Sequence, residues 1–162
     1  MSNITFTNSS GIYQLKAEQY LPISKIEAWD FLVNPKNLPV ITPPHMNFEI
    51  TSPYTEEKIY AGQIITYKVS PFKGFRSNWV TEITEVVNGE YFIDEQRFGP
   101  YAMWHHEHMI TEKDNGVNMV DIISYKPPFG FIGALMEPIV IRKQLKQIFE
   151  FREKKLNELF PA

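Results

Sequence analysis

The sequence predicts an α+β fold, in which a curved antiparallel sheet of seven strands surrounds one long C-terminal helix and two short helices separate the first two strands. Three observations carry this prediction: β-rich segments alternate with turn signals from 46 to 126, Asn88-Gly89 marks a tight hairpin, and residues 132–159 have helical spacing. A helix of that length is too long to fit inside a small sheet as one of its connections. We therefore expect it to cross one face of the sheet and to leave a groove there.

The first predicted elements are a strand and the two short helices. Residues 12–20 alternate between apolar and polar side chains, which is typical of a half-buried strand. Ser24 and Glu27 have the spacing of a capping box and predict a helix over 24–33. Proline is favoured at the first position of a helix, so a second short helix is expected over 35–41.

The six remaining strands are separated by glycine, proline and asparagine turn signals. They are expected over 46–51, 62–70, 74–87, 90–98, 101–112 and 117–126. After Pro127-Pro128 the pattern becomes helical, and a stripe that includes Leu145, Phe149, Arg152 and Leu156 recurs at helical spacing. Pro138 lies early in this region, so a kink or a helix start is expected near it.

Composition excludes several classes of function. The chain has 162 residues, 43% apolar and 22% charged, which suits one globular domain over 1–162. It has no cysteine, which excludes thiol nucleophiles and cysteine-ligated metals, and its net charge of −3 offers no basic surface to nucleic acid. No apolar segment approaches the roughly 20 residues of a membrane span, and no signal peptide is recognisable, so we expect a cytoplasmic protein. The high aromatic content of 14% needs an explanation.

Strand alternation places an unusual mixture of side chains on the inward face of the sheet. A two-residue turn after Val87 sets Trp79 opposite Phe98 and Ile83 opposite Asp94, while the register of the last hairpin stays open by one residue. The inward apolar residues are Phe75, Trp79, Ile83, Phe92, Phe98, Trp104, Ile110, Met119, Ile123 and Tyr125. The inward polar residues are Asp94, Gln96, His106, His108 and Asp121. A solid apolar core does not tolerate so many unpaired polar groups. A ligand cavity does, because its wall is apolar and aromatic but includes a few polar groups that bind the ligand.

We therefore expect a ligand cavity between this face and the last helix. Its predicted ligand-binding residues are Trp79, Phe92, Asp94, Phe98, Trp104, His106, His108, Asp121, Tyr125 and Phe149. Trp104-x-His106-x-His108 is the sharpest local motif, because alternation puts both imidazoles on one side of a strand. Three interpretations stay open: histidines bonded to Asp94 and Asp121 in a semi-polar core, histidines that contact a ligand, and a pair that binds metal.

Catalysis and metal binding are the alternatives to simple ligand binding. The catalytic candidates are His106, His108, Asp94 and Asp121, since a histidine beside a desolvated carboxylate can act as an acid–base pair in a cyclase, dehydratase or hydrolase. His106-x-His108-x3-Glu112 resembles the first part of a cupin metal motif, but no later histidine follows. Because a third strong ligand is not evident, we expect no bound metal and no other cofactor. A filled interior would instead indicate a purely structural interaction domain.

Two longer motifs and the order of the elements carry a family resemblance. The motifs are Gly99-Pro100-Tyr101-x2-Trp104-x-His106-x-His108 and Asp121-x3-Tyr125-x2-Pro128-x-Gly130. Over about residues 11–160 the chain resembles the SRPBCC ligand-binding proteins of the START/Bet v 1-like superfamily, with the helix-grip fold, and in particular their polyketide cyclase-like branch. The resemblance implies a deep cavity that binds a lipid, aromatic or polyketide-like molecule. No catalytic residue can be assigned from this resemblance, because proteins of one fold can catalyse different reactions or none.

Overall fold

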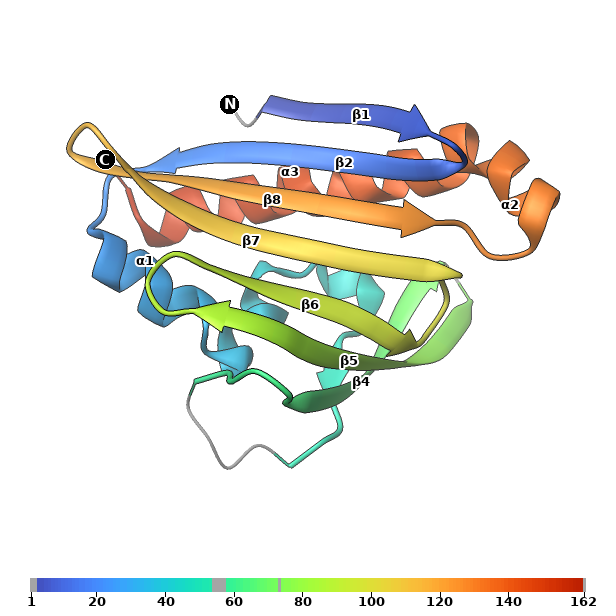
Figure 1. Cartoon of the computed structure of the whole chain (residues 1–162), viewed down its shortest axis with the longest axis horizontal. Helices are drawn as coiled ribbons and strands as arrows, with labels where there is room; N and C mark the ends of the chain where they lie inside the picture. The colour runs from blue at the N-terminus through green and yellow to red at the C-terminus, as the bar shows by residue number, and fades with distance from the viewer. Residues whose placement is uncertain (1–2, 54–57, 73, 162) are drawn as a thin grey trace.

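The C-terminal helix lies along one face of a curved antiparallel sheet (Figure 1). The structure, a computed structural model, describes residues 3–53, 58–72 and 74–161. In Figure 1 helix α3 (Arg142–Leu159) passes behind the sheet. The predicted α+β class and the long helix packed against an antiparallel sheet are confirmed. Among the helices of the described residues, none has the length and apolar character needed to cross a membrane.

The sheet has eight strands rather than the predicted seven. In chain order they are β1 (Asn3–Ser9), β2 (Ile12–Leu21), β3 (Glu49–Ile50), β4 (Ile64–Phe72), β5 (Phe75–Val87), β6 (Tyr91–Phe98), β7 (Met103–Lys113) and β8 (Gly116–Lys126). Their spatial order is β1-β2-β8-β7-β6-β5-β4-β3. The sequence analysis missed β1 because this edge strand carries only two apolar side chains, Ile4 and Phe6, among polar residues.

The two predicted short helices lie between β2 and β3. They are α1 (Lys25–Leu32) and the 3₁₀ helix η1 (Pro35–Ile41), and a further 3₁₀ turn, η2 (Pro44–Met46), leads into β3. The Ser24 hydroxyl accepts a hydrogen bond from the Glu27 amide at 3.2 Å, so the predicted cap of α1 is formed.

The predicted helix over 132–159 is divided into three parts. The chain forms α2 (Gly130–Met136), a π-helical turn η3 (Glu137–Ile141) and then α3. Pro138 explains the interruption, because proline has no amide hydrogen to donate and its ring excludes regular α-helical bonding. The predicted irregularity near this proline is therefore confirmed.

Glu137 anchors the π-helical turn to the sheet. Its side chain is fully buried, and one carboxylate oxygen accepts a hydrogen bond of 2.6 Å from the Tyr125 hydroxyl on β8. Arg142 donates to both oxygens of the same carboxylate, at 3.2 and 3.0 Å. A buried charge is tolerated only when it is paired and hydrogen-bonded, and these contacts meet that requirement.

Replacing Tyr125 with phenylalanine tests this anchor. We expect the Tyr125→Phe variant to lose about 1–2 kcal/mol of unfolding free energy, because Glu137 would keep only Arg142 as a partner. Urea denaturation measures the change. Tyr60→Phe is the matched control, because Tyr60 is 53% exposed and its loss should stay within about 0.5 kcal/mol. Equal losses in the two variants would show that the anchor contributes nothing.

The hairpin of β5 and β6 has the predicted register in its middle but not at its end. Ile83 pairs with Asp94 as predicted. The connecting turn has three residues rather than two, and bulges lie on both sides of the stretch that contains this pair. Beyond the second bulge Phe98 pairs with Val80 rather than Trp79 and is 74% exposed. A bulge shifts the register by one residue and turns the following side chains to the other face.

The hairpin of β7 and β8 resolves the register that the sequence left open. A two-residue turn pairs Trp104 with Tyr125 and His108 with Asp121, so the predicted inward residues of the two strands share one face. The predicted inward position of Phe75 is wrong, since its side chain is 53% exposed at the start of β5.

Two apolar cores fill the space between the sheet and the helices. The first core includes Leu15, Val69, Trp79, Ile123, Tyr125, Leu145 and Phe149, and the second includes Leu21, Trp29, Phe92, Ile110, Met119 and Leu156. A polar layer separates them, because the inward order is Met119, Asp121, Ile123 along β8 and Phe149, Arg152, Leu156 along α3. This layer contains the candidate site.

Candidate functional site

Five ionisable side chains form a buried cluster between the two cores. The buried cluster consists of Asp94 on β6, His106 and His108 on β7, Asp121 on β8 and Arg152 on α3. The pairing register of the strands brings these residues together. Asp94 on β6 lies opposite His106 on β7, and His108 on β7 lies opposite Asp121 on β8. The two histidines, Asp121 and Arg152 are each no more than 8% exposed.

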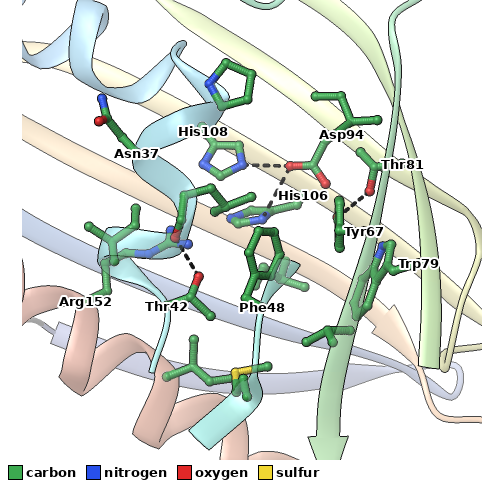
Figure 2. A pocket seen from close by; sticks show the side chains of 18 of the residues that line it. Asn37, Thr42, Phe48, Tyr67, Trp79, Thr81, Asp94, His106, His108 and Arg152 are labelled. Atoms are coloured by element: carbon green, nitrogen blue, oxygen red, sulfur yellow. Dashed lines mark hydrogen bonds and ion pairs between the residues drawn. The ribbon is translucent and has the colours of Figure 1, made fainter. Parts of the chain in front are cut away.

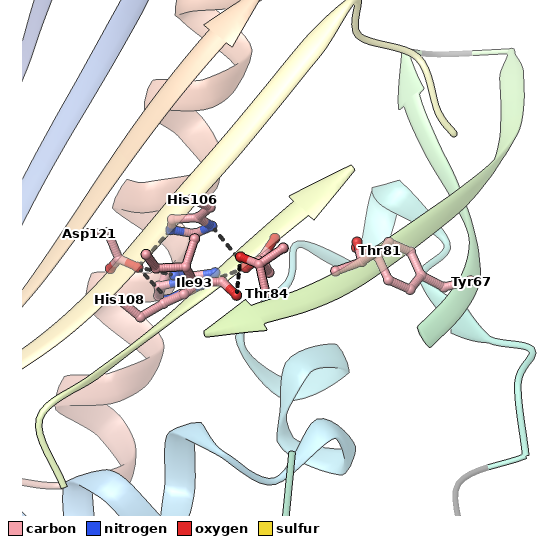
Figure 3. Close-up of polar contacts among 9 residues, drawn as sticks. Tyr67, Thr81, Thr84, Ile93, His106, His108 and Asp121 are labelled. Carbon is pink, nitrogen blue, oxygen red and sulfur yellow. Dashed lines mark hydrogen bonds and ion pairs between the residues drawn. The ribbon is translucent and has the colours of Figure 1, made fainter. Parts of the chain in front are cut away.

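Each imidazole lies between the carboxylates of Asp94 and Asp121. Figure 3 shows Asp121 facing both rings. His108 Nε2 is 2.8 Å from Asp94 Oδ2, and His106 Nε2 is 2.9 Å from Asp121 Oδ1, both with hydrogen-bond geometry. The other two ring nitrogens face the carboxylates without forming hydrogen bonds. His106 Nδ1 is too distant, at 3.6 Å from Asp94 Oδ2, and His108 Nδ1 lies 2.9 Å from Asp121 Oδ1 but at an angle unsuited to a hydrogen bond. Arg152 Nη1 donates to Asp121 Oδ1 at 3.1 Å.

Burial and neighbouring charges give the two histidines opposite protonation preferences. Burial, reinforced by the adjacent His108, lowers the pKa of His106 to about 4, so its imidazole is neutral at pH 7. Burial also acts to lower the pKa of His108, but its contacts with Asp121 and Asp94 outweigh burial and raise that pKa above the usual value. The pKa values of these two neighbouring imidazoles are therefore shifted in opposite directions.

The two carboxylates of the buried cluster stay ionised. Burial is the largest single influence on both groups and would raise their pKa values. At Asp94 the hydrogen bond with His108 and the charges of His106, His108 and Arg152 together outweigh burial and lower the pKa. At Asp121 the Arg152 guanidinium and the contacts with both histidines together outweigh burial and hold the pKa well below its usual range. The two carboxylates thus face the Arg152 guanidinium and a histidine whose pKa is raised, and such pairing is the condition for keeping carboxylates out of water.

A cavity of about 180 Å³ lies beside the buried cluster (Figure 2). Asp94, His106 and His108 form its polar end, while most of its wall is apolar and comes from η1, β4, β5 and α3. Trp79 and Gln144 line the same space, and Trp79 Nε1 and Gln144 Oε1 are buried without a hydrogen-bond partner in the described part of the chain. Buried polar atoms are normally paired, so an unpaired donor and acceptor beside a cavity are positions where an occupant can bond.

Most of the predicted ligand-binding residues line this cavity. They are Trp79, Phe92, Asp94, Trp104, His106, His108 and Phe149. Phe98 does not, because the second bulge turns it to solvent. Tyr125 is fully buried in the first core, and Asp121 lies behind the histidines rather than on the cavity wall. Glu112, the third residue of the cupin-like motif, is exposed.

Sequence reasoning missed two parts of the site. Arg152 was placed in the apolar stripe of the last helix, and a charged residue in such a stripe is a signal that something inside pairs with it. Tyr67 and Thr81 hydrogen-bond to each other on the cavity wall, and burial raises the pKa of the Tyr67 hydroxyl. The inward parity of Thr81 on β5 was visible in the sequence, but nothing there indicated its partner.

Comparison with solved structures places the fold among known ones. Protein Ms6760 from Mycobacterium smegmatis aligns over 97% of this chain and 99% of its own, with a TM-score of 0.67 and 14% identity. A protein from Arthrobacter aurescens aligns over 95% and 91%, with a TM-score of 0.70 and 11% identity. Major latex-like protein 151 from Panax ginseng aligns over 94% and 100%, with a TM-score of 0.68 and 11% identity.

These similarities concern the fold alone, because every identity is low. The arrangement is the predicted helix-grip fold, with one strand more than expected. No protein-family model matches the sequence, and no curated protein matches it significantly.

Proposed function

We propose that this protein binds a compact apolar or amphipathic organic molecule in the cavity between the sheet and α3. The observation that carries the proposal is an apolar cavity that ends on charged and unpaired polar groups, Asp94, His106 and Trp79 Nε1 among them. Ligand sites typically combine an apolar lining with a few polar groups that fix orientation.

The size of the cavity favours a ring-sized ligand. Its volume is about 180 Å³, and an engineered apolar cavity of about 150 Å³ is known to accept benzene. A single aromatic or polyketide-like ring suits this volume, whereas only part of a long-chain lipid would fit inside it. The unpaired Trp79 Nε1 is a donor, so a carbonyl, phenol or ether oxygen on the ligand would find a partner there.

Binding can be tested by titrating the protein with an apolar fluorescent probe such as 8-anilinonaphthalene-1-sulfonate. Replacing Trp104 with alanine should weaken probe binding about tenfold, because it removes a cavity-lining ring that packs edge-on against Trp79. Phe98→Ala is the matched control: the sequence assigned Phe98 to the cavity wall, but it is 74% exposed and should leave affinity unchanged. The proposal would be contradicted if both variants bound the probe equally weakly, or if both bound it as well as wild type does.

Acid–base catalysis in the same cavity is the second candidate function. It is favoured by the position of His106, which lies on the cavity wall and bonds to Asp121 at 2.9 Å, because a carboxylate that orients an imidazole is a common feature of acid–base pairs. Such a pair would serve a cyclase, dehydratase or hydrolase. Native mass spectrometry separates the candidates: a co-purified molecule recovered unchanged supports binding, and one converted by wild type but not by His106→Gln supports catalysis.

A further inference from the structure

The end of the cavity at the buried cluster presents the donor set of a transition-metal site. Asp94, His106 and His108 each offer one ligand atom, and these atoms lie within 4.8 Å of one another. All three residues line the cavity. We propose that Asp94, His106 and His108 bind a divalent first-row transition ion as a site of two histidines and one carboxylate. This inference does not rest on the proposed organic ligand, because the ion can be tested alone.

The geometry around Asp94 is close to that of a ligand set. Asp94 Oδ2 is 2.8 Å from His108 Nε2 and 3.6 Å from His106 Nδ1, and Figure 2 shows both contacts converging on this carboxylate. Ligands bonded at 2.0–2.2 Å to one ion in tetrahedral or octahedral geometry lie about 3.0–3.4 Å apart. The two separations from Asp94 lie on either side of that range, and all three ligand atoms lie within 4.8 Å of one another, so an ion would draw the two imidazole nitrogens and the carboxylate oxygen to a common centre.

The opposite side of both imidazoles has the arrangement expected around metal-bound histidines. His106 Nε2 and His108 Nδ1 each lie 2.9 Å from Asp121 Oδ1. Arg152 donates to the same oxygen at 3.1 Å and so holds this carboxylate in place. Histidines that bind metals usually direct their second nitrogen at a carboxylate or carbonyl, which fixes the ring orientation. Asp121 hydrogen-bonds to the His106 ring and lies against Nδ1 of the His108 ring.

Asp94 supplies the third ligand that is not evident from the sequence. The sequence predicts no bound metal, because His106, His108 and Glu112 match only the first part of the cupin motif and no later histidine follows. The structure brings the third ligand from the neighbouring strand, where Asp94 pairs directly with His106. Three protein ligands on one side leave the cavity side of the ion open, as in sites where a metal binds water or an oxygen of a small molecule.

Titration of chelator-treated protein with Co²⁺ tests the site. We expect one Co²⁺ per chain by calorimetry, with the visible absorption of a nitrogen- and oxygen-bound ion. Asp94→Asn should weaken binding at least 100-fold, and Asp121→Asn, which alters only the carboxylate behind the rings, should weaken it about 10- to 100-fold. His105→Gln is the matched control, because His105 bonds to Glu95 instead of joining the buried cluster, and it should bind Co²⁺ as wild type does.

Two outcomes overturn the proposal: binding of much less than one equivalent, or equal weakening by His105→Gln and Asp94→Asn. If Asp94→Asn does not fold, NMR of the wild-type protein decides the question. Paramagnetic broadening by Co²⁺ must then centre on the ring signals of His106 and His108 and spare those of His45 and His105. Broadening centred on His45 or His105 would equally contradict the site.

Discussion

Replacing Asp121 with asparagine is expected to lower the free energy of unfolding by about 3–5 kcal/mol. Asp121 accepts from Arg152 and His106 in a layer where all three side chains are buried. Removing one partner of a buried ion pair leaves the other charge without compensation, and this is the costly way to disrupt such a pair. Chemical denaturation of the metal-free protein measures the loss.

A double-mutant cycle separates this pairing from simple loss of packing. Arg152→Met removes the unpaired charge while keeping most of the side-chain volume, so the double variant Asp121→Asn/Arg152→Met should be more stable than the sum of the single losses implies. Asp30→Asn is a matched surface control: Asp30 pairs with Lys58 at 2.7 Å but is half exposed, and its loss should cost under 1 kcal/mol. Additive losses across the cycle would show that Asp121 and Arg152 do not stabilise each other.

Stability of the metal-free protein should fall as the pH is lowered from 6.5 to about 4. The folded state holds the pKa of His106 at about 4, against 6.5 as the ordinary value, so in this interval the unfolded chain binds a proton that the folded chain does not. The slope can reach about 1.4 kcal/mol per pH unit for one such group. The contribution is complete above pH 6.5 and is lost as pH falls toward 4.

His108 and the carboxylates act outside that interval. The raised pKa of His108 contributes stability that is complete below pH 6.5 and is lost as pH rises through its folded value. The lowered pKa of Asp121 contributes stability that is lost only well below pH 4. Denaturation of His106→Gln between pH 4 and 6.5 should therefore show a flatter profile than wild type, and His45→Gln, an exposed site, should not. Parallel profiles for wild type and His106→Gln would refute this assignment.

Local signals predicted the elements because each depends on residues close in the chain. The capping of α1 by Ser24, the proline start of η1 and the irregularity at Pro138 involve bonds within one or two helical turns. Helix periodicity and strand alternation likewise reflect which neighbours share a face. Where such a pattern is weak the prediction failed, as in β1, whose apolar side chains are only Ile4 and Phe6.

Bulges limited the prediction of the cavity wall. The middle of the β5–β6 hairpin has the expected register because a longer turn and a bulge compensate each other, and Ile83 still meets Asp94. The second bulge has no such compensation, so Phe98 turns outward and Trp79 loses its expected neighbour. A bulge turns the side chains that follow it to the opposite face of the sheet. It leaves no mark in the spacing of apolar and polar residues along the strand, so the sequence does not reveal it.

Strand alternation alone puts Asp94, His106 and His108 on the aromatic side of the sheet, where the structure has them. Asp121 joins them through the pairing of β7 with β8, whose register the sequence left open. The contacts that these groups make depend on how the strands and α3 pack. The tertiary structure brought Arg152 from the last helix onto Asp121 and put Asp121 behind the rings and Asp94 on the cavity. The physical reason is that ion pairing and ligand geometry depend on distances of a few ångströms between strands and a helix that are remote in sequence, and periodicity specifies a face but not a distance.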